Sequence, residues 1–178
     1  MNFLPGGLEG LVIVEPRVFR DDRGFFLEPY HAPRYKAAGI DVDFVQDNHS
    51  FSTRGVLRGL HFQKSPGQAK LIRCARGRIW DVAVDIRPGS STFGKWWGLE
   101  LDSEAHRQLF IPVGFAHGFC VLSEEAEVMY KCSRVYDPVT ESGILWNDAE
   151  IGVEWPVQDP IVSERDIKAA TFRKFREG

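Results

Sequence analysis

The sequence predicts an all-β fold of the jelly-roll type, a barrel or sandwich of antiparallel strands with a few short helices. Short apolar or β-branched runs recur at spacings of about 8–12 residues, and turns rich in glycine and proline separate them. In Arg78–Arg87 apolar residues alternate with aspartates and an alanine, which is the period of a strand with one face in a core. The segment Trp97–Asp102 repeats this alternation.

Each expected strand is an apolar or β-branched run that ends at a turn signal, such as Ser65–Gly67 or Asp137–Pro138. In chain order the runs are Gly24–Pro29, Phe44–His49, Val56–Gln63, Lys70–Ala75, Arg78–Arg87, Trp97–Asp102, Gln108–Pro112, His117–Leu122, Glu127–Tyr136 and Gly143–Trp146. Their number and even spacing favour one antiparallel β-domain without repeats or linkers.

Helix signals occur in only two places. Pro33–Ala38 is followed by Gly39, which can adopt the left-handed conformation that ends a helix. Near the C-terminus, Ser163–Phe175 begins with Ser163 and Asp166, whose side chains can cap a helix.

Length and charge limit the classes of function. The 178 residues suit a single domain, residues 1–178, large enough to bury its own core. The 22 basic and 25 acidic residues give a net charge of -3, which excludes a general binder of nucleic acid. Three cysteines without a CxxC pair favour a reducing compartment. No run resembles a signal peptide or membrane span, so we expect a cytoplasmic protein with no membrane partner.

The segment Arg54–Gln63 carries charged side chains on an otherwise apolar strand. Strict alternation places Arg58 and His61 on opposite faces. They share one cavity only if the strand bends or bulges, and Gly59 between them is the residue that would allow it. Lys70, at the start of the next strand, then lies within reach of whatever Arg58 binds.

Two further segments carry titratable side chains. His117 lies in Gly114–Phe119, where glycines allow close backbone approach and aromatics supply apolar surface. Tyr130 shares an apolar strand face with Val128 and Cys132. Taken alone, each of these side chains also fits a core position with a satisfied polar group. No His-x-His pattern occurs, so we expect no metal site.

Taken together, these segments resemble the dTDP-4-dehydrorhamnose 3,5-epimerase family, nucleotide-sugar epimerases of the metal-free cupin type. The resemblance covers nearly the whole chain and rests on the number and order of its motifs. These are VFRDDRGFFLE at Val18–Glu28, FVQDNHS at Phe44–Ser50, GVLRGLHFQ at Gly55–Gln63, KLIRC at Lys70–Cys74, DVAVDIR at Asp81–Arg87, STFGKW at Ser91–Trp96, RQLFIPVGFAHGF at Arg107–Phe119, YK at Tyr130–Lys131, GILWND at Gly143–Asp148 and IGVEWP at Ile151–Pro156. The resemblance implies a cupin-type jelly roll that works without a cofactor.

The resemblance also implies roles for matching residues. His61 would be the catalytic base, Asp166 its partner, Tyr130 the opposing acid and Lys70 a neighbour of the sugar ketone. The implied substrate-binding positions are Arg23, Phe26, Glu28, Gln46, Asp47, Asn48, Arg58, His117, Glu141 and Arg165. Of these, Arg23 and Glu28 would act across a homodimer interface, through exchanged N-terminal strands. At Arg165 the family often has lysine, which keeps the charge but changes the geometry.

The implied reaction inverts C3 and C5 of dTDP-4-dehydro-6-deoxy-D-glucose, on the way to dTDP-L-rhamnose. The C4 ketone acidifies the hydrogens at both carbons, so one base and one acid on opposite sides of the ring are required. A mono-epimerase acting on C3 or C5 alone is an alternative reading. A metal-dependent cupin enzyme and a non-catalytic sugar-binding cupin are two more. The glycan that receives the sugar, lipopolysaccharide or another, stays open.

Overall fold

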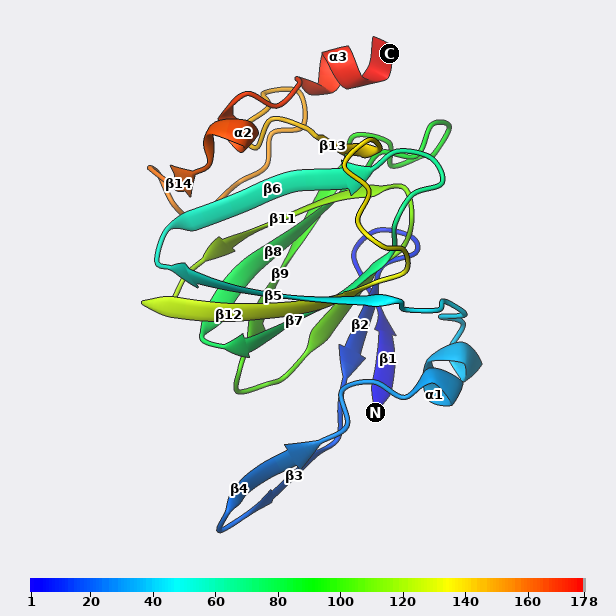
Figure 1. Ribbon diagram of the computed structural model, residues 1–178, viewed down its shortest axis with the longest axis vertical. Coiled ribbons are helices and arrows are strands. Elements are labelled where there is room, and N and C mark those ends of the chain that lie inside the picture. Colours follow the sequence, from blue (N-terminus) through cyan, green and yellow to red (C-terminus); the bar gives the residue numbers. More distant parts are fainter. Residues whose placement is uncertain (178) are drawn as a thin grey trace.

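The chain forms two facing β-sheets, to which a projecting hairpin and three short helices are attached (Figure 1). The computed structural model describes residues 1–177. No helix in this range is long and apolar enough to cross a membrane. The predicted all-β jelly-roll architecture is confirmed.

One sheet has six strands in the order β1-β2-β10-β7-β12-β5, and all its pairs are antiparallel. Their bounds are β1 Asn2–Pro5, β2 Val12–Glu15, β5 Gln46–Thr53, β7 Lys70–Arg76, β10 Gln108–Ile111 and β12 Glu125–Cys132. Val128 and Tyr130 of β12 point inward and pack on the core between the sheets. This sheet forms one wall of the cavity described below.

The facing sheet has the order β13-β6-β11-β8-β9, and β14 adds to β6 in parallel. Its strands are β6 Val56–Gln63, β8 Arg78–Asp85, β9 Trp96–Asp102, β11 Phe115–Val121, β13 Glu141–Gly143 and β14 Ile161–Val162. The predicted strand Val56–Gln63 is therefore confirmed at both ends.

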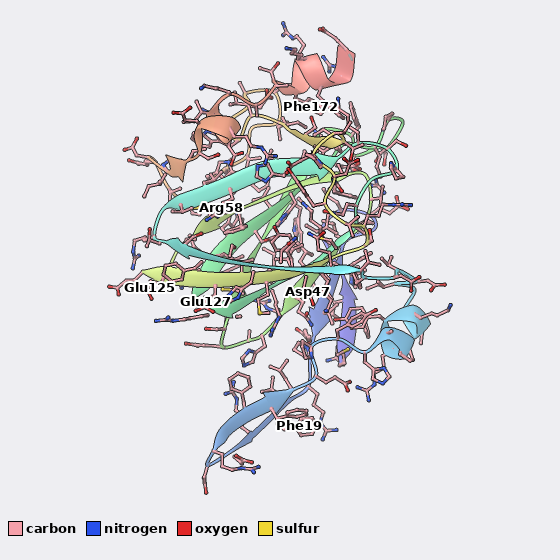
Figure 2. The ribbon with its side chains drawn as sticks, in the orientation of Figure 1. Phe19, Asp47, Arg58, Glu125, Glu127 and Phe172 are labelled. Atoms are coloured by element: carbon pink, nitrogen blue, oxygen red, sulfur yellow. The ribbon has the colours of Figure 1, made fainter. Side chains whose placement is uncertain are left out.

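The remaining strands, β3 Val18–Asp21 and β4 Gly24–Leu27, pair with each other and form a separate two-stranded sheet. We call this hairpin the arm. It projects away from the two large sheets, and Phe19 on it lies far from Arg58 on β6 (Figures 1 and 2). The arm exposes three phenylalanine side chains, Phe19, Phe25 and Phe26.

The helix predicted at Pro33–Ala38 is confirmed as α1, Ala32–Ala37, and Gly39 has a φ of +88°. A short helix near the C-terminus is confirmed, but the extent predicted for it, Ser163–Phe175, is wrong: the structure divides this segment into α2, Glu164–Ile167, and α3, Phe172–Glu177. Between them Ala170 forms a β-bridge with Ile144, which takes the chain off the helical path. Packing against a strand outweighs helix propensity here.

A hydrophobic core fills the space between the sheets, with Ile72 and Val128 from one and Ile79 and Phe119 from the other. A second cluster covers the outer face of β6, β11 and β8 with C-terminal side chains such as Phe172. The prediction that Arg78–Arg87 buries only one face is therefore wrong. Its alternating positions are buried on both sides, including the two aspartates.

Candidate active site

A cavity of about 540 Å³ opens between the two sheets. Strands β6, β7, β11, β12 and β13 line it, and the segment Ile161–Asp166 closes one side. Its polar lining includes Arg58, His61, Lys70, His117, Tyr130 and Glu141. The cavity therefore gathers most of the residues that the resemblance implies, although they are spread over more than a hundred positions.

Strand β6 carries the bulge that Arg58 and His61 need in order to share one cavity. His61 pairs with His117 on β11 and Arg58 with Phe119, so β6 has one more residue than β11 between the pairs. Gly59 has a φ of +130°, and a Cβ atom there would lie 2.5 Å from the Cα of Gly118. The extra residue turns both Arg58 and His61 toward the cavity, which confirms the prediction.

His61 is held by a buried carboxylate. Its Nε2 lies 2.7 Å from Oδ1 of Asp166, and the Gly59 N–H donates to Oδ2 of the same carboxylate at 3.2 Å. Ser163 caps α2 by accepting from the Asp166 N–H, which fixes the aspartate in place. Burial alone would raise the pKa of Asp166, but its hydrogen bonds with His61 and Gly59 outweigh this and keep the pKa below its ordinary value.

Lys70 and Tyr130 come from the opposite sheet. Burial lowers the pKa of Lys70, because a desolvated ammonium is less stable, and nearby Cys132 and Asp81 partly offset this. Burial also raises the pKa of Tyr130, so its phenol keeps its proton at neutral pH. The cavity thus has an imidazole on one wall and a protonated phenol on the other.

Glu141 joins the rim of the cavity to α2. It accepts from Tyr136 Oη at 2.6 Å and pairs with Arg165 Nη2 at 2.7 Å. Burial would raise the pKa of Glu141, but these two hydrogen bonds hold it below its ordinary value. Tyr136 exposes about half of its surface, 52%, and leaves an aromatic ring accessible at the rim. Sequence reasoning missed Tyr136, because an isolated tyrosine in a turn carries no pattern.

The segment Gln46–Asn48 splits between two faces, as strand alternation requires. Gln46 Oε1 accepts from the Tyr136 N–H, and Asn48 lies opposite Tyr130 in the pairing of β5 with β12. Asp47 points to the outer face and pairs with Lys131 at 3.0 Å. Gln46 and Asn48 are therefore neighbours of the site, and the structure does not bring Asp47 into it.

The arm residues also lie outside this cavity. Arg23 is largely exposed and pairs with Asp21 at the arm's tip, and Glu28 pairs with Arg34 at its base. Phe26 and Glu28 line a separate hollow beside α1. Within one chain these three residues are not brought to His61.

Sequence reasoning missed Asp81, which is fully buried beside the cavity with Oδ2 2.8 Å from His117 Nε2. An aspartate in an alternating strand predicts a solvent-facing side chain, but Asp81 shares the inner face of β8 with Ile79 and Ala83, and the opposite sheet covers that face. Within residues 1–177 no three His, Cys, Asp or Glu side chains form a group able to hold a metal ion.

Comparison with known proteins is consistent with this geometry. A family model described as dTDP-4-dehydrorhamnose 3,5-epimerase matches residues 6–174. The dTDP-4-dehydrorhamnose 3,5-epimerase of Shigella flexneri is 54% identical over 174 residues, which are 97% of this chain and 96% of that protein. The dTDP-4-dehydrorhamnose 3-epimerase of Streptomyces niveus is 42% identical over 99% of this chain and 86% of its own length.

A solved structure is also similar to this chain, in both sequence and fold. The dTDP-6-deoxy-D-glucose-3,5-epimerase of Legionella pneumophila, in complex with dTDP-4-keto-L-rhamnose, superposes with a TM-score of 0.93 at 45% identity. The match covers 97% of this chain and 93% of that one. With a family model over almost its whole length and relatives of this similarity, the chain belongs to the dTDP-4-dehydrorhamnose 3,5-epimerase family.

Proposed function

We propose that this enzyme inverts C3 and C5 of dTDP-4-dehydro-6-deoxy-D-glucose and so makes dTDP-4-dehydro-L-rhamnose for dTDP-L-rhamnose biosynthesis. One observation carries the proposal: His61 and Tyr130 line the same cavity from strands of facing sheets. A sugar ring bound between these sheets has a base on one side and an acid on the other, which is what inversion at carbon requires.

His61 takes the proton from the carbon beside the ketone. Because Nε2 is bonded to Asp166, the ring nitrogen that accepts the proton is Nδ1, and the carboxylate stabilises the imidazolium that forms. Electrons from the broken C–H bond move to the C4 oxygen and give an enolate. The Lys70 ammonium lies in the same cavity and stabilises this oxygen.

Tyr130 completes each inversion from the opposite wall. Its hydroxyl gives a proton to the enolate carbon, the C4 carbonyl reforms, and the configuration at that carbon is reversed. Solvent then returns a proton to Tyr130 and removes one from His61. The same two groups serve C3 and C5 in turn, so no oxidant, reductant or cofactor is consumed.

The diphosphate needs positive charge in a protein of net charge -3. Arg58 and Arg165 line the cavity and supply it locally, because guanidinium groups match phosphate oxygens. The exposed ring of Tyr136, whose hydroxyl donates to Glu141 on the cavity rim, offers a flat surface for the base of the nucleotide. The contacts implied for Gln46, Asn48 and His117 belong to the same proposal, whereas Asp47 lies outside the site.

We further propose a homodimer in which each arm enters the partner's site and brings Arg23, Phe26 and Glu28 to the nucleotide. The support is that Phe26 is 69% exposed on an arm that projects from its own chain, and such apolar surface favours burial against a partner (Figure 1). We place the enzyme in the cytoplasm, in keeping with three buried, free cysteines.

Turnover in deuterated water tests the double inversion. A 3,5-epimerase places two solvent deuterons in the product sugar, whereas a C3 or C5 mono-epimerase places one. The similarity to the 3-epimerase of Streptomyces niveus makes this second outcome a specific alternative. One deuteron, counted by mass spectrometry of the isolated product, would refute the proposal. Activity lost to a chelator and restored by a metal ion would instead support a metal-dependent cupin enzyme.

A further inference from the structure

Two His–Asp pairs lie side by side in the cavity, and the mechanism above uses only one. His61 on β6 and His117 on β11 are direct partners across the two strands. Each uses Nε2 to contact a buried carboxylate, Asp166 at 2.7 Å and Asp81 at 2.8 Å. In both pairs Nδ1 has no hydrogen-bond partner among residues 1–177, and both imidazoles line the cavity.

The two carboxylates differ in how their charge is neutralised. Asp166 also accepts from the Gly59 N–H, so its second oxygen is satisfied. Asp81 is completely buried, and its Oδ1 has no hydrogen-bond partner in the described chain. A buried carboxylate with a single hydrogen bond is costly unless its partner is positively charged or the carboxyl itself is protonated.

This difference decides where the protons are. If Asp81 is a carboxylate, an imidazolium at His117, which carries hydrogen on both ring nitrogens, balances its charge. If Asp81 is protonated, it donates to Nε2, and the single ring hydrogen of His117 is on Nδ1. In both of these electrically neutral states of the pair, Nδ1 of His117 carries a hydrogen. His61, as the base, must present a bare Nδ1.

The surroundings of His117 make Asp81 necessary for this arrangement. Arg58 and His61 from β6, Lys70 from β7 and Tyr130 from β12 line the same cavity, together with Glu141 and Arg165 at its rim. Lys70 and Arg58 bring cationic groups to this cavity. Asp81 on β8, directly behind the imidazole, is the acidic group in hydrogen-bond contact with it.

We propose that Asp81 is a positioning residue that keeps a hydrogen on Nδ1 of His117, so that this nitrogen donates to an oxygen of the substrate sugar. The sugar is favoured over the diphosphate because His117 lies directly across from His61, which the proposed mechanism places at the reacting carbons. The choice of ligand rests on the proposed function, whereas the position of the hydrogen rests on the His117–Asp81 geometry alone.

Nitrogen-15 NMR of the histidine side chains, near neutral pH and without ligand, tests the position of the hydrogen. We expect the His117 signals, assigned by their loss in His117→Asn, to report a protonated Nδ1 in the wild-type protein. His61 should report hydrogen on Nε2 only. A His117 ring with a bare Nδ1 would overturn the proposal. This measurement needs neither a variant at Asp81 nor turnover.

Asp81→Asn tests the consequence for the reaction. The amide oxygen can accept from Nε2, but without the carboxylate charge the ring becomes neutral and Nδ1 turns from a donor into an acceptor. We expect kcat/KM to fall by about 100-fold, as when one well-placed donor is lost. The Kd for dTDP, which lacks the sugar, should stay within about twofold of wild type. The reason is that His117 donates to the sugar and makes no contact with the nucleotide in this proposal.

Asp85→Asn is the matched control, because Asp85 is a second fully buried aspartate on β8 that contacts Arg87, Ser90 and Thr92 instead. It should lower stability yet leave the His117 signals unchanged. Wild-type kcat/KM in Asp81→Asn would overturn the proposal, and an equal loss of dTDP binding would overturn the assignment to the sugar. A wild-type protein without epimerase activity would refute the proposed function and leave the NMR result intact.

Discussion

Asp166 Oδ1 lies 2.7 Å from His61 Nε2, although 105 positions separate the two residues in the chain. Strand β14 pairs with β6 in parallel and leads directly into α2, which delivers Asp166 to the strand that carries His61. The C-terminal segment therefore supplies the carboxylate that partners the catalytic base, His61. Because the carboxylate occupies Nε2, it fixes the tautomer in which Nδ1 is free to accept a proton.

Asp166→Asn should lower kcat by about 100-fold or more, the range for loss of effective general-base catalysis. The amide would keep the shape of the side chain but could hold the imidazole in the wrong tautomer and would not stabilise the imidazolium. Steady-state kinetics checks this. Glu164→Gln on the same helix, an exposed residue paired with Lys168, serves as the control and should keep wild-type kcat. An unchanged kcat in Asp166→Asn would remove Asp166 from the mechanism.

Tyr130→Phe should separate proton removal from inversion. His61 remains in this variant, so it can still remove a proton and return a deuteron to the same face. We expect solvent deuterium to enter the substrate without a change of configuration, while product formation falls by about 100-fold or more. NMR of the sugar in deuterated water distinguishes the two events. His61→Ala should abolish both, and efficient inversion by Tyr130→Phe would show that another group is the acid.

The fall of kcat/KM at alkaline pH should come from deprotonation of Lys70, which we call the alkaline limb of the pH–rate profile. Burial lowers the pKa of this ammonium, so it loses its proton at a lower pH than a free lysine, whereas burial raises the pKa of Tyr130. The enolate then loses its stabilising charge as pH rises. In Lys70→Arg the guanidinium stays charged, so we expect a lower kcat/KM at neutral pH but a limb moved to higher pH. Lys64→Arg, the control, should leave the pH–rate profile unchanged. If the alkaline limb of Lys70→Arg stays at the wild-type pH, the limb comes from a group other than Lys70.

Local sequence pattern predicted the parts of the fold that depend on neighbouring residues. Arg58 and His61 occupy opposite phases of one strand and can share a cavity only if the strand bends or bulges at Gly59, and the structure has this bulge and places both on the cavity. Strand Val56–Gln63 follows from an apolar run between turn signals, and the first helix follows from the glycine that ends it. The grouping of the cavity residues came from resemblance, since no local rule brings Asp166 to His61.

The features that sequence reasoning missed depend on distant packing. Asp81 and Asp85 fit the exposed phase of an alternating strand, but both are buried. The inner face of β8 is covered by the opposite sheet and the outer face by the C-terminal segment with Phe172. Tyr136 is placed at the rim of the site by its hydrogen bond to Glu141, which the sequence does not indicate. Such long-range cover leaves no periodic signal in the strand itself.

Gly59→Ala should destabilise the fold and disturb the site together. Its Cβ atom would lie 2.5 Å from Gly118 Cα and 2.8 Å from His117 O, both of them backbone atoms that cannot swing away. We expect the free energy of unfolding to fall by more than the about 1–3 kcal/mol typical of a strained backbone conformation. Gly55→Ala is the control, since Gly55 also has a positive φ, of +78°, but has nothing within 4 Å of a new Cβ. Equal urea midpoints for the two variants would contradict the close approach of β6 and β11.

The proposed exchange of arms predicts that two inactive variants restore each other. Arg23→Ala damages the arm, and His61→Ala damages the cavity of its own chain. In a mixed dimer, the cavity of the Arg23→Ala chain receives an intact arm from the His61→Ala chain and forms one undamaged site. Random mixing makes half of the dimers mixed, so about a quarter of all sites should recover wild-type kcat. The variants are mixed after reversible dissociation and assayed together, with each variant alone as the control. Native mass spectrometry would confirm that mixed dimers have formed. If they form and no activity returns, each active site is built from a single chain and the exchange of arms is wrong.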